Sequence, residues 1–351
     1  MKIHIPVALL FLLYTLGVKA QNDSTDDTRY RLFQATFVYP MGTSGPSSSR
    51  TIYNVSVNAL TGVTGGVDGI EISGLINNNT KYVEGAQFAG IGNVTNGYIQ
   101  AAQFGGIYNI VGQSSEGFQA GGIFNIINGS MEGVQVAGIK NACRDMEGVQ
   151  IGGIINIAKD VEGAQIGGII NKAKNVEGIQ LAGIINICDS IDGIPIAPIN
   201  YVRKNGYRRF EISSNEMFDA NISYKIGVRQ LYTFITFGVS KEDTPFNSAY
   251  GLGIGSNMKF NKFFSIDFEG LYSSINYHWN FDPYNHLTTL RAHAVFNITK
   301  RIALFGGPSA NLLISSYEKD ANRIVPEWSY SYEQQSEYLN YWIGFNAGLR
   351  F

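Results

Sequence analysis

Charged residues are scarce in this chain, and basic residues are not in surplus. Only 15% of the 351 residues are charged, 44% are hydrophobic, and the formal net charge is −2. Disordered chains have too few apolar residues to build a core, so this composition excludes disorder. Because phosphate binding needs a basic surface, it also excludes a nucleic-acid-binding protein.

Patterns that carry catalysis or hold a cofactor are also missing. The sequence has no nucleophile motif and no metal-ligand spacing, and His278, His286 and His293 stand too far apart for a metal pair on a helix. Glycine pairs recur so often that a chance match to a phosphate-binding loop has no meaning. We therefore expect no enzyme, no cofactor and no metal site.

Long apolar runs are absent after the first twenty residues, which excludes membrane-spanning helices but not a β-barrel. The first twenty residues combine Lys2, an apolar run over 5–16 and a small residue at Ala20. This pattern is typical of a secretory signal peptide cut near Ala20, because the run is too short to span a membrane. Residues 21–28 then form a polar tether.

Glycine is abundant, at 41 positions, and most of it lies in a repeat between about residues 70 and 200. The unit reads Gly, any residue, Gln, apolar, Gly or Ala, Gly, Ile, any residue, Asn, and it returns every 15 or 16 residues. The Gln column is Gln87, Gln103, Gln119, Gln135, Gln150, Gln165 and Gln180. The Asn column is Asn77, Asn93, Asn109, Asn125, Asn141, Asn156, Asn171 and Asn186.

A unit of this length fits two short strands, such as residues 149–151 and 154–158, joined by a Gly-Gly bend and followed by a polar turn at 159–163. Stacked units predict a β-solenoid in which the Asn side chains hydrogen-bond along a ladder. Alternation places three columns inside: the Asn column, an aliphatic column and a small column two residues after each Asn. The aliphatic column is Leu75, Ile91, Ile107, Ile123, Ile139, Ile154, Ile169, Ile184 and Ile199, and the small column is Val111, Ile127, Cys143, Ala158, Ala173 and Cys188.

The two cysteines share the small column, three coils apart. At about 4.8 Å per strand their separation is roughly 14 Å, whereas a disulfide needs Cα atoms within about 7 Å. We therefore predict that Cys143 and Cys188 are buried free thiols.

A second interpretation treats each unit as one transmembrane β-strand of a larger barrel, because VQIGGIINIA alternates over ten residues. Lys140 and Lys172 would then face lipid at roughly 2–4 kcal/mol each. In the solenoid, the apolar columns that hold Ile155 and Ile157 form an exposed stripe, which indicates a binding surface. We favour the solenoid and keep the larger barrel as the alternative.

Beyond residue 205 the repeat stops, and eight alternating segments predict strands. They are residues 209–215, 220–228, 231–240, 249–260, 263–275, 287–298, 302–314 and 341–351. Tight connections at 229–230, 261–262 and 299–301 alternate with long loops at 241–248, 276–286 and 315–340, as in outer-membrane barrels. Side chains fill the interior of an eight-stranded barrel.

Alternation directs a set of charged side chains into this lumen. They are Lys225, Lys259, Asp267, Glu269, Arg291, His293 and Arg350. We interpret them as lumen charges that satisfy one another, not as a catalytic set.

The GxQxGGIxN units resemble the bacterial surface-repeat proteins of spirochaetes and other Gram-negative bacteria, over residues 70–200. The last strand, ending in Phe351, is similar to the sorting signal of outer-membrane barrels. The resemblance implies a location at the surface or in the envelope, and no catalytic residues.

We thus expect an all-β chain with a signal peptide (1–20), a tether with an N-terminal strand (21–55), a repeat β-solenoid (56–202) and an eight-stranded antiparallel outer-membrane β-barrel (205–351). The first functional hypothesis is a non-enzymatic protein of the outer membrane or cell surface. Its barrel is anchored in outer-membrane lipid, and its repeats present an adhesin-like or scaffold surface to a protein or glycan ligand. The second is a porin-like channel made by the larger barrel. The side of the membrane on which the repeats lie stays open.

Overall fold

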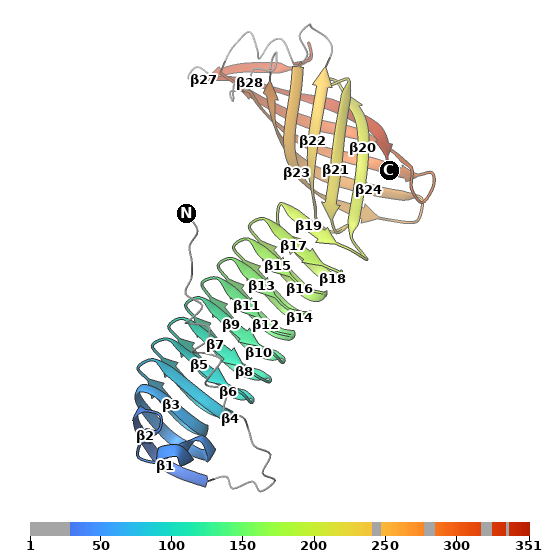
Figure 1. Cartoon of the computed structure of the whole chain (residues 1–351). Helices are drawn as coiled ribbons and strands as arrows, with labels where there is room; N and C mark the ends of the chain where they lie inside the picture. Colours follow the sequence, from blue (N-terminus) through green and yellow to red (C-terminus); the bar gives the residue numbers. More distant parts are fainter. Residues whose placement is uncertain (1–28, 241–246, 277–284, 317–324, 335–336) are drawn as a thin grey trace, which may run out of the picture.

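The computed structural model describes residues 29–240, 247–276, 285–316, 325–334 and 337–351. It has a parallel β-solenoid of about nine turns followed by a closed eight-stranded antiparallel β-barrel, which confirms the predicted fold class (Figure 1). The alternative of one larger barrel is wrong, because neighbouring repeats pair in parallel. The predicted signal peptide and tether, residues 1–28, lie outside the described residues. Within the described ranges, no helix is long and apolar enough to cross a membrane.

Most coils of the solenoid consist of one longer and one shorter strand. The longer strands carry the Gln column, which ends at Pro195 in the last of them: β6 (Ile99–Gly105), β8 (Ser115–Gly121), β10 (Met131–Ala137), β12 (Asp145–Gly152), β14 (Asp160–Gly167), β16 (Asn175–Ala182) and β18 (Ser190–Ile196). The shorter strands carry the Asn column: β5 (Gly92–Thr95), β7 (Tyr108–Val111), β9 (Phe124–Ile127), β11 (Lys140–Ala142), β13 (Ile155–Ile157), β15 (Ile170–Lys172), β17 (Ile185–Cys188) and β19 (Ile199–Val202).

The N-terminal end of the solenoid is less regular. It contains β1 (Arg29–Val38), β2 (Met41–Gly42), the 3-10 helix η1 (Gly45–Arg50), β3 (Thr51–Ser73) and β4 (Ile76–Ala89). Strand β1 pairs in parallel with β3, from Arg29 opposite Thr51 onward. The stack of parallel strands therefore starts before residue 56.

Two edges run along the solenoid. At the bend edge, a bend joins the longer to the shorter strand as predicted, but it lies at Gly153 and Ile154, because Gly152 still belongs to β12. At the turn edge, the predicted turn over 159–163 is wrong, because β14 already begins at Asp160. Gly163 lies inside this strand with a φ of 124°, and an added Cβ there would overlap the carbonyl oxygen of Gly148. Glycine keeps this segment extended by letting successive coils approach closely.

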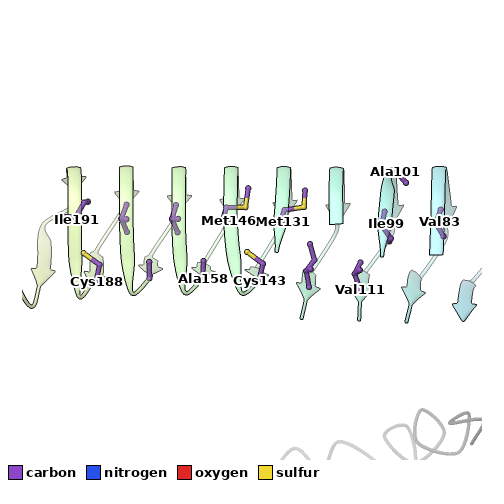
Figure 2. Packing of buried hydrophobic residues seen from close by; sticks show 14 of the residues in the cluster. Val83, Ile99, Ala101, Val111, Met131, Cys143, Met146, Ala158, Cys188 and Ile191 are labelled. Atoms are coloured by element: carbon purple, nitrogen blue, oxygen red, sulfur yellow. The ribbon is translucent and has the colours of Figure 1, made fainter. Parts of the chain in front are cut away.

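The interior is apolar towards the turn edge and polar towards the bend edge. Figure 2 shows the apolar part, in which residues of the longer strands face residues of the shorter strands. The residues on the longer strands include Val83, Ile99, Met131, Met146 and Ile191. Those facing them lie on the shorter strands, as Val111 and Cys188 do, or directly after one, as Cys143 and Ala158 do. The Gln and Asn columns fill the other part and are at most 1% exposed.

The aliphatic column, predicted to point inward, points outward instead. Ile154 is 40% exposed and Ile184 is 51% exposed. Each of these residues lies in the bend and not in a strand, so the two-residue alternation does not extend through it. Ile199 pairs with Ile185 in the last, shorter coil and is also exposed.

The barrel strands follow the predicted segments closely. They are β20 (Tyr207–Asn215), β21 (Ala220–Gly227), β22 (Tyr232–Ser240), β23 (Asn247–Lys259), β24 (Phe264–Asn276), β25 (Asn285–Asn297), β26 (Ala303–Ser315) and β28 (Glu337–Arg350). Antiparallel pairing of β20 with β28 closes the barrel. A further short strand, β27 (Tyr330–Gln334), pairs with β28 within the segment predicted as a long loop.

The two ends of the barrel differ. At the short-turn end, residues 228–231, 260–263 and 298–302 join the strands, and the chain terminates there after β28. The connections 241–246, 277–284 and 316–336 join the strands at the opposite, long-loop end. The solenoid meets the short-turn end (Figure 1), where Thr233 Oγ1 donates a hydrogen bond to the carbonyl oxygen of Pro198 at 2.8 Å.

Candidate functional site

The outer face of the barrel is an apolar belt bordered by aromatic side chains. Exposed aliphatic residues in the belt include Ile235, Leu252, Ile254, Leu290 and Ile343. Exposed aromatic residues near the long-loop end are Phe237, Tyr250, Tyr272 and Tyr341, and those near the short-turn end are Phe210, Phe260, Phe263, Phe296 and Phe351. An apolar belt with a girdle of aromatic residues at each border is typical of barrels in outer membranes.

A buried set of charges, which we call the ion cluster, fills the lumen towards the short-turn end. Its members are Glu211, Lys225, Asp267, Glu269, Arg291 and Arg350. Lys225 Nζ lies 2.8 Å from Glu211 Oε1 and 3.5 Å from Asp267 Oδ2, and it also contacts Glu269. One ammonium group thus joins three carboxylates from two different strands, β20 and β24.

The two arginines of the ion cluster balance the remaining charge. Arg291 Nε lies 2.7 Å from Glu269 Oε2. Arg350 Nε lies 2.5 Å from Glu211 Oε1, and this guanidinium also contacts Asp267. Three cations face three carboxylates, so the ion cluster is neutral and each of its charges has a partner.

The structure brings together five of the predicted lumen charges, which are Lys225, Asp267, Glu269, Arg291 and Arg350. His293 is buried beside them, with Nδ1 4.0 Å from Glu269 Oε2. Lys259 is not in the lumen but exposed at the end of β23. Glu211 was missed, although its alternation with Arg209 in β20 gives the same signal that found the others.

The long-loop end of the lumen is closed by apolar packing. The buried cluster there contains Met217, Phe218, Ala249, Ile275, Leu287, Leu313 and Trp342. Glu216 holds the 216–219 connection against β28, because its carboxylate accepts hydrogen bonds from Trp342 Nε1 at 2.7 Å and from the Phe345 amide at 3.0 Å. Side chains therefore fill the lumen towards both ends.

In the solenoid, the buried amides form two ladders that point in opposite directions. Each Asn donates towards the C-terminal end, as Asn141 Nδ2 does to Asn156 Oδ1 at 3.0 Å. Its second donor hydrogen is used by a backbone carbonyl, here that of Ile151 at 2.8 Å. Each Gln donates towards the N-terminal end, as Gln150 Nε2 does to Gln135 Oε1 at 2.8 Å. The amide dipoles of the two ladders therefore oppose each other, and the buried donors are satisfied.

Glu71 stands where the Gln ladder ends. It is fully buried and accepts hydrogen bonds from Gln87, Asn79, Ser56 and Asn58. Burial raises the pKa of Glu71, and these four donors oppose that shift. Because each Gln donates towards the N-terminal end, the ladder has to end there on an acceptor. The carboxylate of Glu71 provides the acceptor oxygens.

Cys143 and Cys188 lie in the buried small column as free thiols. Burial raises the pKa of both to about 12. Gln150 Nε2 also lies 3.2 Å from Cys143 Sγ. Because the thiolate is the reactive form, these cysteines are inert near neutral pH.

An acidic column, which sequence reasoning missed, runs along the exposed face of the longer strands. It contains Glu116, Glu132, Glu147, Glu162, Glu177 and Asp192, each opposite the next in the parallel register. Among the described residues, no cation pairs with the last five of these. The signal was a carboxylate three residues before every Gln of the column except Gln103, which Gln100 precedes instead.

A groove of about 600 Å³ lies between the acidic column and the turn edge, over strands β10 to β18. At the turn edge the carboxylates are paired: Arg144 with Asp145 at 2.8 Å, and Lys159 with Asp160 at 3.0 Å. Hydrogen bonds from Asn175 and Lys159 lower the pKa of Asp160. Of the carboxylates that line the groove, those of the acidic column have no cationic partner among the described residues, so the groove is suited to a cationic ligand.

Like charges at strand spacing destabilise the solenoid itself. We expect the Glu147→Gln/Glu162→Gln/Glu177→Gln variant to be more stable than the wild type by on the order of 1 kcal/mol at low salt. The gain should vanish near 1 M salt, where the screening length is about 3 Å. Urea unfolding followed by far-UV circular dichroism at the two ionic strengths measures the difference. Lys159→Gln/Lys174→Gln is the control and should give no gain, and equal or lower stability of the triple variant at low salt would contradict the repulsion.

No protein-family model, curated protein or solved structure matches the chain. No group of His, Cys, Asp and Glu within the described ranges is arranged to hold a metal ion. The geometry thus offers two candidate functional features, a barrel with a filled lumen and a solenoid with an unpaired acidic face.

Proposed function

We propose that the protein is a non-enzymatic scaffold of the outer membrane, in which the barrel is the anchor and the solenoid is the interaction module. One observation carries this proposal: a barrel with an apolar belt and a filled lumen continues directly into a stack of nearly identical coils. A filled lumen suits an anchor, because an eight-stranded barrel has just enough room for its own side chains. Export through a signal peptide belongs to the same proposal.

The two ends of the barrel support an orientation. Outer-membrane barrels have short turns on the periplasmic side and longer loops outside. The solenoid joins the short-turn end, next to the C-terminal Phe351. The repeats are therefore periplasmic in this proposal, and the long-loop end alone faces the cell exterior.

The acidic groove supports a partner with positive charge. Charge complementarity favours a basic protein segment over a neutral glycan, because five neighbouring carboxylates have no cation within the described structure. Binding of this kind weakens steeply as salt is added. The buried thiols and the ion pairs of the turn edge have no part in this proposed binding.

Labelling of single introduced cysteines tests the orientation. Lys159→Cys lies on the exposed turn edge and Tyr332→Cys at the long-loop end, while Cys143 and Cys188 are buried. A polymer-linked maleimide too large for porins should label Tyr332→Cys in intact cells. It should label Lys159→Cys only after the outer membrane is permeabilised. Labelling of Lys159→Cys in intact cells would show that the repeats are external.

Planar-bilayer recordings test the filled lumen. We expect the full-length protein to give no steady conductance, because the ion cluster and the apolar cap occupy the lumen. A porin reconstituted in parallel is the positive control. A stable, reproducible conductance step would favour the channel hypothesis instead.

A further inference from the structure

The bend edge of the solenoid carries two continuous apolar rails. The first rail follows the Gln column: Ile72, Phe88, Phe104, Ala120, Val136, Ile151, Ile166, Leu181 and Ile196. The second rail is Leu75, Ile91, Ile107, Ile123, Ile139, Ile154, Ile169 and Ile184, stacked by backbone hydrogen bonds such as Ile169 N to Ile154 O at 3.1 Å. Neither rail contains a charged residue.

A shallow groove runs beside the first rail, and its floor is bare backbone. Gly90, Gly106 and Gly122 form the floor of one stretch of about 500 Å³, beside Phe88 and Phe104. An added Cβ at each of these glycines would overlap the carbonyl oxygen of the preceding coil. Stacking therefore dictates the glycines, but it does not dictate that the flanking rails are aliphatic.

At the bend edge, the usual arrangement of an apolar interior and a polar surface is reversed. Inside lie the amide ladders, and outside lie aliphatic side chains, whereas the turn edge has an apolar interior and a charged exterior. Fourteen rail residues are 36–51% exposed. Together they expose on the order of 1,000 Å², above the roughly 300–600 Å² of the largest patch on a typical monomer.

We infer that the bend edge is the interface with a second copy of this chain. A stable interface needs about 800 Å² from each partner, which the rails supply. The rails repeat at about 4.8 Å, the strand spacing, so a partner has to present apolar groups with the same period over eight coils. A second solenoid does so by construction, and a two-fold axis joins the same edge of both copies into a closed pair.

The direction of the pair rests on the proposed membrane anchor. Two solenoids side by side in parallel place both barrels at one end, so that both can enter one membrane. An antiparallel pair would separate the barrels to opposite ends. In the parallel pair each coil faces the same coil of its partner. The two-fold axis runs between the copies, parallel to the solenoids, and therefore sets the second rail of one copy against the first rail of the other. Ile154 thus lies opposite Ile151 of the partner subunit.

Copy number in lipid nanodiscs tests the pair. The full-length chain is reconstituted with a large excess of discs, and the protein copies in each disc are counted by single-molecule photobleaching. We expect two copies in most occupied discs. Ile154→Asp/Ile169→Asp should lower the two-copy fraction at least tenfold, and the matched turn-edge variant Lys159→Asp/Lys174→Asp should leave it unchanged. A single copy per disc for the wild type would overturn the inference, and so would a single copy whose rails are covered by lipid.

Cross-linking tests the register, and electrophoresis separates the two proposals. With copper phenanthroline as oxidant, Ile151→Cys chains and Ile154→Cys chains reconstituted together should form a covalent dimer, and Lys159→Cys chains should not. Equal cross-linking at both edges would overturn the parallel pair. Slower or faster migration of unheated samples in SDS gels, relative to boiled ones, reports the folded barrel separately. A folded, inserted barrel with one copy per disc would contradict only the dimer. A chain recovered in the aqueous phase would contradict the proposed membrane anchor as well.

Discussion

Replacing Gly168 by alanine is expected to disrupt the solenoid, whereas the same change at the adjacent Gly167 is expected to be tolerated. An added Cβ at Gly168 would overlap the carbonyl oxygen of Gly153 in the preceding coil. Backbone cannot move aside as a flexible side chain can, so two coils would have to separate and their ladders would open. We expect a loss of about 3 kcal/mol or more.

Gly167 provides a matched control one residue away. Its added Cβ would lie 2.7 Å from Asn171 Oδ1 and 2.8 Å from the carbonyl oxygen of Ile170, a milder overlap than the 2.0 Å at Gly168. In other coils, the same column is occupied by Ala89, Ala137 and Ala182. The coil therefore accommodates a methyl group there, and we expect a loss of about 1 kcal/mol or less.

Far-UV circular dichroism during urea unfolding of the full-length chain measures both glycine variants. Tryptophan fluorescence reports the barrel separately, because Trp279, Trp328 and Trp342 all lie beyond residue 205. An equal, small effect of both substitutions would show that the coils are less closely stacked than the structure has them.

Periodicity made most of the solenoid predictable. The Gln and Asn columns repeat with the same spacing, so the sequence favoured parallel stacking in register, and the parallel pairing of neighbouring coils then excluded the larger barrel. The orientation of the aliphatic column did not follow, because Ile154 lies in a bend where strand alternation fails. The start of β14 at Asp160 was not predicted, for a different reason. Gly163 and Glu162 are of residue types that are depleted in strands, and pairing with the neighbouring coils overrides that preference.

In the barrel, alternation predicted most of the charged side chains that point inward, although not Glu211 and wrongly Lys259, and it did not predict which of them meet. Lys225 contacts Glu211, a residue of the neighbouring strand β20, and Glu269, which comes from β24 on the far side of the lumen. Contacts across the lumen depend on strand tilt and stagger, which a single sequence does not specify. The same holds for Glu216, whose partner Trp342 is distant in the chain.

Replacing Lys225 by methionine is expected to destabilise the barrel by about 3–5 kcal/mol. The substitution keeps the volume of the side chain but removes the cation that contacts Glu211, Asp267 and Glu269. All three carboxylates are at most 4% exposed, so water cannot replace the lost partner. A buried charge without compensation costs far more than an exposed one.

Urea unfolding in lipid vesicles, followed by tryptophan fluorescence, measures this loss. Lys262→Met, on an exposed residue of the 260–263 turn, is the control and should change stability by less than about 0.5 kcal/mol. The double variant Lys225→Met/Glu269→Gln should regain part of the loss, since it makes the ion cluster neutral again. That recovery distinguishes a charge effect from simple mispacking, which the second substitution would not repair. A Lys225→Met barrel as stable as the wild type would mean that the three carboxylates do not depend on this ammonium group, and the ion cluster would then not be the unit that fills and holds the lumen.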